Sequence, residues 1–200
     1  MKRIGISLGW NCASAIYGVE NNIRDTKQNG YLTCPFDEMV TNLSGLIKCI
    51  DEDFKYFHDE NYLIIKNHNG ENLIHNTRYN FIFNHESPGH ANLYITQNWP
   101  GGINHYIDNN YNKFKERYTK RINHFLNYIN NPNNHIVFIL TAYKETNHNI
   151  LRLKHTLNTK YPHLSYEFLF TPVGYYDTNV VLHYGLMGFS DYDVEWEDLV

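Results

Sequence analysis

The chain has 200 residues, of which 42% are hydrophobic and 19% are charged, with a net charge of −4 at pH 7. This composition is typical of a folded globular protein and excludes a disordered chain. The acidic balance, with a pI near 6.3, argues against a general nucleic-acid-binding protein, which usually carries a basic excess. No apolar run approaches the ~18 residues of a membrane span, so we expect no membrane partner.

The first apolar segment, residues 4–8, is predicted to be a buried strand that ends at Gly9. A basic start followed by apolar residues imitates a secretory signal peptide. However, Gly9, Trp10 and Asn11 interrupt the apolar run within a few residues, which favours the strand. A helix of small and apolar residues is predicted over residues 12–19.

The following segments show short strand and helix patterns. Residues 30–36 and 61–66 are strand-like, and residues 42–54 place apolar side chains at helical spacing. Residues 78–86 also have the pattern of a strand. The turn at residues 67–70 predicts a hairpin in this part of the chain.

The clearest element is an amphipathic helix over residues 106–129, where apolar side chains recur every three or four residues. Residues 135–140 are an apolar run of the kind found inside parallel sheets. A helix over 147–160 and a strand over 166–170 follow, and residues 180–183 are a candidate last strand. This alternation predicts an α/β fold with a central, mostly parallel sheet flanked by helices, and with the hairpin region as an insertion. We expect one domain over the whole chain, with a short acidic C-terminal tail.

Cys12 occupies the most informative position in the sequence. A strand that ends in glycine and leads into a helix is where α/β folds expose reactive groups. The free N–H groups at a helix start stabilise an anion, lower the pKa of a thiol there and can bind an oxyanion. Asn11 offers a side-chain donor to the same oxyanion. The simpler alternative is a small cysteine that packs a tight strand–helix junction.

A thiol nucleophile needs a histidine base and usually a third group that orients it. Among twelve histidines, His85 is the best candidate because it follows an apolar strand, and His183 is its rival. Asp37 follows Pro35 and either orients a histidine or caps the next segment. Arg121 lies beside the apolar stripe of the long helix and pairs either with a carboxylate or with substrate.

Other site patterns are missing from the sequence. There is no nucleotide-binding glycine motif, no serine-hydrolase elbow and no zinc-protease motif. Three cysteines, Cys12, Cys34 and Cys49, without zinc spacing indicate a reducing compartment. We therefore expect no metal, no cofactor and a cytoplasmic location.

Four motifs, taken in chain order, resemble one known family. They are Ser7-Leu8-Gly9-x-x-Cys12, Pro35-Phe36-Asp37, Phe83-x-His85-Glu86 and Tyr118-x-x-Arg121-Ile122-x-x-Phe125. The family is described as putative papain-like cysteine peptidases, a domain of unknown function found in bacteria and large DNA viruses. For a viral member the expected location is the host cytoplasm. The resemblance covers most of residues 3 to about 170, and this chain has Glu38 where family members more often carry tryptophan.

The resemblance implies a thiol nucleophile at Cys12 with His85 as its partner, and a papain-like α+β fold as the alternative architecture. We therefore expect a cysteine hydrolase or acyl transferase that acts on a peptide or another amide, ester or thioester. Cys12 would attack the carbonyl, His85 would take and return the proton, and Asp37 would orient His85. The expected substrate-binding residues are Gly9, Asn11 and Arg121.

Two other classes of function remain open on the sequence. A non-catalytic module would bind an anion or a nucleotide-sugar through the backbone amides of residues 7–12. A carbohydrate-processing enzyme of the α/β-hydrolase type would depend on Ser7 or Asp37 more than on Cys12.

Overall fold

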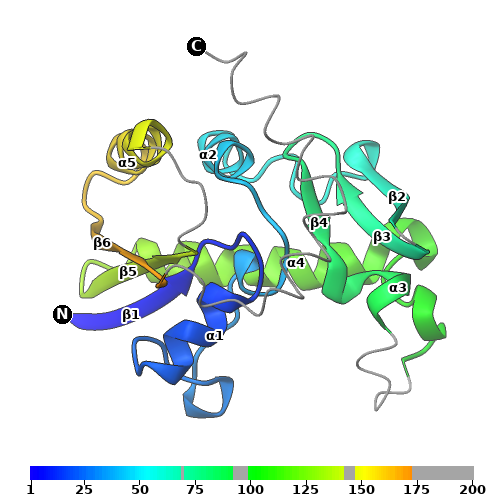
Figure 1. Ribbon diagram of the computed structural model, residues 1–200, viewed down its shortest axis with the longest axis horizontal. Coiled ribbons are helices and arrows are strands. Elements are labelled where there is room, and N and C mark those ends of the chain that lie inside the picture. The colour runs from blue at the N-terminus through cyan, green and yellow to red at the C-terminus, as the bar shows by residue number, and fades with distance from the viewer. Residues whose placement is uncertain (69, 92–98, 142–146, 173–200) are drawn as a thin grey trace.

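The structure is a computed structural model that describes residues 1–68, 70–91, 99–141 and 147–172. Within these ranges the strands form two sheets of three strands each. Figure 1 shows the two sheets side by side, with one long helix running behind both. The expected strand at residues 180–183, its His183 and the acidic tail lie outside the described residues.

The first sheet is parallel and carries the N-terminal strand. It contains β1 (Lys2–Ser7), β5 (Asn134–Leu140) and β6 (Ser165–Phe170) in the order β1-β5-β6. β1 and β6 both pair with β5 in parallel, with Ile4 opposite Ile136. The predictions of a central, apolar strand near residues 135–140 and of an α/β fold are confirmed.

Four helices flank the parallel sheet: α1 (Ala13–Glu20), α2 (Leu43–Asp51), α4 (Asp108–Ile129) and α5 (Asn147–Lys160). Helix α1 packs closely on the sheet because Gly18 faces β5. A Cβ at Gly18 would come within 2.6 Å of the Ile139 side chain. Helices α2 and α5 lie side by side and contact each other.

The second sheet is antiparallel and forms the predicted hairpin region. It contains β2 (Leu63–His68), β3 (Glu71–Asn76) and β4 (Phe81–Phe83) in that order. The hairpin expected around residues 67–70 joins β2 to β3. After β4 come the 3₁₀ turn η4 (Asn84–Glu86) and the short helix α3 (Pro88–Ala91).

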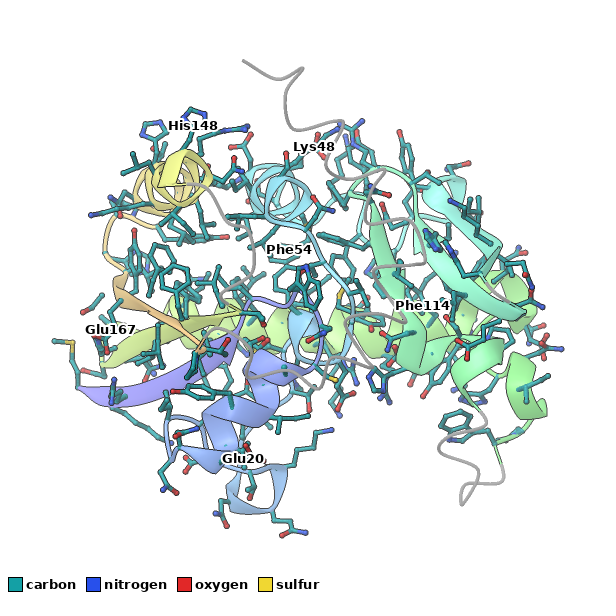
Figure 2. The ribbon with its side chains drawn as sticks, in the orientation of Figure 1. Glu20, Lys48, Phe54, Phe114, His148 and Glu167 are labelled. Carbon is teal, nitrogen blue, oxygen red and sulfur yellow. The ribbon has the colours of Figure 1, made fainter. Side chains whose placement is uncertain are left out.

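Helix α4 connects the two sheets through its apolar stripe. Near its start, the Phe114 ring lies 4.7 Å from the Phe83 ring of β4, centroid to centroid. Three turns later, the Phe125 ring lies 6.4 Å from the Phe138 ring of β5. Figure 2 shows Phe54 and Phe114 in the interior of the molecule, where both are buried. No helix in the described ranges is long and apolar enough to cross a membrane.

Two predicted strands are wrong or too long. Residues 30–36 do not form a strand, because Pro35 begins the 3₁₀ turn η2 (Pro35–Glu38). Proline lacks the N–H that a sheet ladder needs, and the Leu32 N–H donates to the Tyr128 hydroxyl instead. The strand expected over residues 78–86 is limited to β4, since the chain turns into η4 at Asn84.

Candidate active site

The turn between β1 and α1 has a left-handed backbone at two successive residues. Gly9 has a φ of 89° and Trp10 a φ of 69°. A Cβ at Gly9 would lie 2.3 Å from Thr41 Oγ1, so only glycine fits beside this hydroxyl. A tryptophan with positive φ is strained, and such strain persists only where the surroundings impose it.

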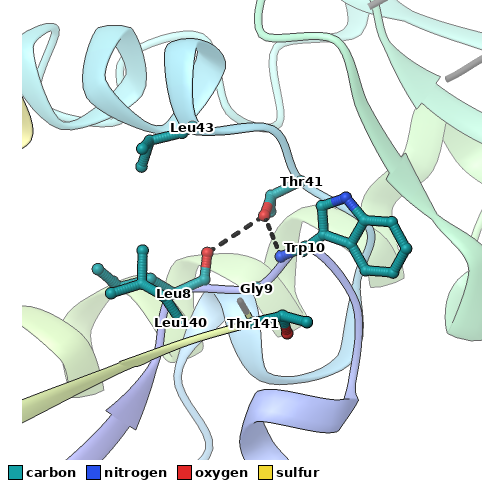
Figure 3. Close-up of a pocket in the computed structure, with 7 residues that line it drawn as sticks. All are labelled: Leu8, Gly9, Trp10, Thr41, Leu43, Leu140 and Thr141. Atoms are coloured by element: carbon teal, nitrogen blue, oxygen red, sulfur yellow. Dashed lines mark hydrogen bonds between the residues drawn. The ribbon is translucent and has the colours of Figure 1, made fainter. Parts of the chain in front are cut away.

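Thr41 imposes this turn with three hydrogen bonds, two of which Figure 3 shows. The Trp10 N–H donates to Thr41 Oγ1 at 2.6 Å, and Thr41 Oγ1 donates to the Leu8 carbonyl at 3.1 Å. The Thr41 N–H donates to the Trp10 carbonyl at 3.2 Å. Thr41 therefore fixes the path of the chain into Cys12.

Ser7 stabilises the other side of the turn. Its hydroxyl is completely buried, accepts from the Gly9 N–H at 3.1 Å and lies 2.7 Å from the Ser14 hydroxyl. The Ser14 hydroxyl also donates to the Gly9 carbonyl at 3.0 Å. Ser7 is thus engaged in holding the turn, which leaves the carbohydrate-hydrolase interpretation without an accessible serine at this position.

Cys12 lies directly before α1 and is partly exposed, whereas Cys34 and Cys49 are buried. Burial raises the pKa of the Cys12 thiol, its own backbone N–H lowers it, and the Glu38 carboxylate raises it further. The net pKa is raised, which differs from the lowered value expected at a helix start. Desolvation and a nearby negative charge raise the pKa of the thiol by more than the start of helix α1 lowers it.

Asn11, the residue before Cys12, has a buried side-chain donor. Its side chain is 2% exposed, and its Oδ1 accepts from the Ala13 N–H at 3.0 Å. Its Nδ2 is buried and has no hydrogen-bond partner among the described residues. Because buried polar groups are almost always paired, this amide has a donor left for an acceptor outside the described residues.

His85 occupies the middle of η4, the turn that follows β4, and is partly buried. Burial lowers the pKa of its imidazole, Glu86 and Glu38 raise it, and Arg121 and Arg117 lower it. The net pKa is lowered, so His85 is neutral at pH 7 and able to accept a proton. Glu38 is therefore close enough to act electrostatically on both His85 and Cys12.

Asp37 has the capping role that the sequence left open. Its carboxylate accepts from the Cys34 N–H at 2.8 Å and from the Tyr31 hydroxyl at 3.3 Å, and pairs with Arg24 at 2.8 Å. Asp37 is completely enclosed by these groups in the turn η2. The structure records these contacts for Asp37, and the orienting role toward His85 remains a prediction.

Arg121 is buried between two carboxylates. Its guanidinium contacts Glu86 at 3.3 Å and donates to Glu38. Glu86, which is fully buried, also accepts from Arg117 at 2.9 Å and from the Tyr118 hydroxyl at 2.9 Å. Arg121 therefore anchors the turn beside His85 to α4, and its role in substrate binding stays a prediction.

Residues 34–41 connect the surroundings of Cys12 with those of His85. Val40 and Ile82 exchange two backbone hydrogen bonds, of 2.9 and 3.0 Å, which tie this segment to β4. The next residue, Thr41, holds the Gly9–Trp10 turn. One short segment thus contacts both the loop before Cys12 and the strand before His85.

Sequence reasoning named Glu86 and Glu38 only within or beside motifs and assigned no role to them, and it missed Arg117 and Thr41 altogether. A signal was present for two of them, because Arg117 and Arg121 are four residues apart and share one face of a helix. Glu86 follows His85 directly. No local pattern indicates that Thr41 binds a turn more than thirty residues earlier.

Of the cavities in the described part of the chain, one lies beside the Gly9–Trp10 turn and another lies away from Cys12 and His85. A pocket of about 10 Å³ behind the Gly9–Trp10 turn has room for about one water. A larger cavity of about 570 Å³ lies between α2 and α5 and is lined by neither Cys12 nor His85. Among the described residues, no group of three or more His, Cys, Asp or Glu side chains is placed to hold a metal ion.

Comparison with known proteins identifies the family. A family model described as "Putative papain-like cysteine peptidase" matches residues 3–171. The chain belongs to this family. The match covers β1, the Cys12 turn, η2, η4 and α4, and so includes every motif that carried the resemblance. No curated protein matches the chain, and neither does any solved structure.

Proposed function

We propose that this member of the papain-like cysteine peptidase family is a cysteine-dependent hydrolase or acyl transferase that acts on a peptide or another carbonyl substrate. One observation carries the proposal. The buried, unpartnered Nδ2 of Asn11 lies next to the partly exposed Cys12, directly after a strained turn. Strain and an unpaired buried donor tend to persist where chemistry uses them.

The proposed reaction begins from a neutral thiol and a neutral imidazole. Because the pKa of Cys12 is raised and that of His85 is lowered, the resting pair is not a thiolate and an imidazolium. Cys12 Sγ attacks the carbonyl carbon while its proton passes to His85, which acts as general base. The carbonyl oxygen becomes an oxyanion that accepts hydrogen bonds from Asn11 Nδ2 and the Cys12 N–H.

The second half returns the proton. The carbon–leaving-group bond breaks, the His85 imidazolium gives its proton to the departing amine, alcohol or thiol, and an acyl-thioester remains on Cys12. Water, or an acceptor nucleophile in a transferase, then loses a proton to His85 and attacks the thioester. The carbon–sulfur bond then breaks, and the His85 imidazolium returns the proton to Cys12 Sγ. Thiol and imidazole are restored, so the cycle needs no cofactor.

Cys12→Ser tests this proposal against the binding alternative. Turnover of a panel of peptide, ester and thioester substrates is expected in the wild type and lost in Cys12→Ser. A wild-type protein that binds phosphate or a nucleotide-sugar without turning over any of the panel, with the same affinity in Cys12→Ser, would instead support the binding module. Cys49→Ser serves as the control for removal of a cysteine.

A further inference from the structure

Glu38 connects the turn η2 to α4 and to Lys27 through its carboxylate. It is the last residue of η2, and its Oε1 accepts from Lys27 Nζ at 2.6 Å. Its Oε2 accepts from Arg121 and lies 3.6 Å from Arg117 Nη2. Its side chain remains 24% exposed, so the carboxylate borders the surface instead of being enclosed like Asp37.

The same turn packs against the elements that carry the reacting groups. η2 contacts β1, α1 and α4, and the Phe36 carbonyl lies 3.5 Å from the Ser7 hydroxyl. Arg121 links Glu38 to Glu86, the neighbour of His85. Glu38 is thus placed between the α1 side, with Cys12, and the η4 side, with His85.

The charge of Glu38 is permanent over the working range of pH. Burial would raise the pKa of its carboxyl, but Arg121, Lys27 and Arg117 lower it to about 2. Glu38 is the charged group that raises the pKa of the Cys12 thiol. Glu86, Glu38, Arg121 and Arg117 act on the His85 imidazole.

We propose that Glu38 is the positioning carboxylate of the Cys12–His85 pair, held in place by Arg121 and Lys27, in the role that the sequence suggested for Asp37. The proposal rests on the proposed function of Cys12. A fixed negative charge stabilises the imidazolium that forms when His85 takes the thiol proton. It also keeps Cys12 protonated until a substrate is bound, because it disfavours the thiolate.

Glu38→Gln tests this role because it keeps the shape of the side chain and removes its charge. We expect the pH midpoint for alkylation of Cys12 by iodoacetamide to fall by about 0.5 unit, which raises the rate about threefold below the midpoint. We expect the pKa of His85 to fall as well. It can be measured by NMR of the imidazole signals, with the His85 signal identified by its absence in His85→Gln. Both shifts have the sign that follows from removing a nearby negative charge.

Glu52→Gln is the matched control, since Glu52 also pairs with an arginine, Arg78, and is not among the groups that act on Cys12 or His85. It should leave both the Cys12 midpoint and the His85 pKa unchanged. A folded Glu38→Gln protein in which neither value moves would overturn the role of Glu38. A Cys12→Ser protein with full turnover would overturn the proposed function. The change in the pKa of His85 in Glu38→Gln would still test the role of Glu38.

Discussion

The side-chain amide of Asn11 has two roles, one for its oxygen and one for its nitrogen. Its oxygen caps the Ala13 N–H at 3.0 Å, and this bond fixes the plane of the amide. Its nitrogen is then left buried beside Cys12 without a partner among the described residues. A donor held in this way needs no reorganisation when an oxyanion forms, which is the condition for strong electrostatic stabilisation.

Asn11→Asp separates these two purposes. The carboxyl keeps the oxygen that caps Ala13, but its second oxygen replaces the buried Nδ2 and has no donor there, so the melting temperature should fall while the protein still folds. The donor is lost, so turnover should fall by about 10²- to 10³-fold. Turnover that equals the wild type in steady-state assays, with folding intact by circular dichroism, would remove Asn11 from the oxyanion site.

Residue-level reasoning from the sequence located Cys12, Gly9 and Asn11 at one strand–helix turn, and the structure places them there. The direction of the Cys12 pKa was wrong because it depends on burial and on Glu38, which comes from a distant turn. The choice between a capping and an orienting role for Asp37 could not be made from the sequence either. Its partners Arg24 and Tyr31 surround it only after the chain has folded.

At the scale of elements, the turn before α1 depends on a threonine from another segment. Thr41→Val keeps the shape of the side chain and removes its hydroxyl, so the Trp10 N–H and the Leu8 carbonyl each lose a partner. An unsatisfied buried group costs about 1–3 kcal/mol. We expect a loss of about 2 kcal/mol in the free energy of unfolding, measured by urea denaturation.

Thr119→Val is the control for this loss, because Thr119 is exposed on α4 and its hydroxyl lies 3.0 Å from His58 Nε2, at the surface. It should change the free energy of unfolding by less than about 0.5 kcal/mol. Equal stability of Thr41→Val and the wild type would mean that Thr41 does not hold the Gly9–Trp10 turn.

The β2–β3 hairpin buries two histidines against each other. The Nε2 atoms of His68 and His75 are 2.6 Å apart, and their rings stack with centroids 4.7 Å apart. Burial, His68 and Lys66 together lower the pKa of His75 from 6.5 to about 3. His75 is therefore neutral in the folded protein at pH values where the unfolded chain binds a proton.

This difference predicts acid sensitivity. Between about pH 6.5 and about 3 the unfolded state binds more protons than the folded state. The free energy of unfolding therefore falls as the pH falls, by up to about 1.4 kcal/mol per pH unit from this one group. His75→Gln should flatten the slope in urea titrations across this window, whereas the exposed His163→Gln should not. Identical slopes in all three proteins would contradict a neutral, buried His75.

The hairpin, the long helix and the parallel β5 could all be predicted because each is a local periodic pattern. The pattern failed at residues 30–36, where Pro35 and the Asp37 cap convert an apolar stretch into a 3₁₀ turn. It also could not show how β4 is tied to residues 34–41, since the Val40–Ile82 bridge joins segments forty residues apart.

At the scale of the whole molecule, one aromatic ring connects the two sheets. Phe36 is fully buried, and its ring lies 6.0 Å from Phe81 in the antiparallel sheet and 5.9 Å from Phe125 of α4. Phe125 in turn contacts Phe138 in the parallel sheet. Both halves of the candidate site therefore share one core around the turn that contains Glu38.

Phe36→Ala tests whether the two sheets unfold together. Removing a fully buried phenylalanine costs about 3–5 kcal/mol. If the prediction of a single domain is right, amide hydrogen exchange should speed up in β4 and β5 alike, with one unfolding transition. Phe36→Leu, which fills most of the space, should show a smaller effect in both strands. Loss of protection in only one sheet would indicate two separately folding units.

The central claim is that Cys12 and His85 act together as nucleophile and base, and alkylation of the thiol by a peptidyl vinyl sulfone at pH 7, through addition of sulfur to the vinyl group, tests it most directly. Mass spectrometry of the labelled protein should locate the adduct on Cys12, with Cys34 and Cys49 unmodified because they are buried. The rate of labelling should fall about 100-fold or more in His85→Gln and stay unchanged in His163→Gln. Equal rates in His85→Gln and the wild type, or an adduct on Cys34 or Cys49, would contradict the pairing.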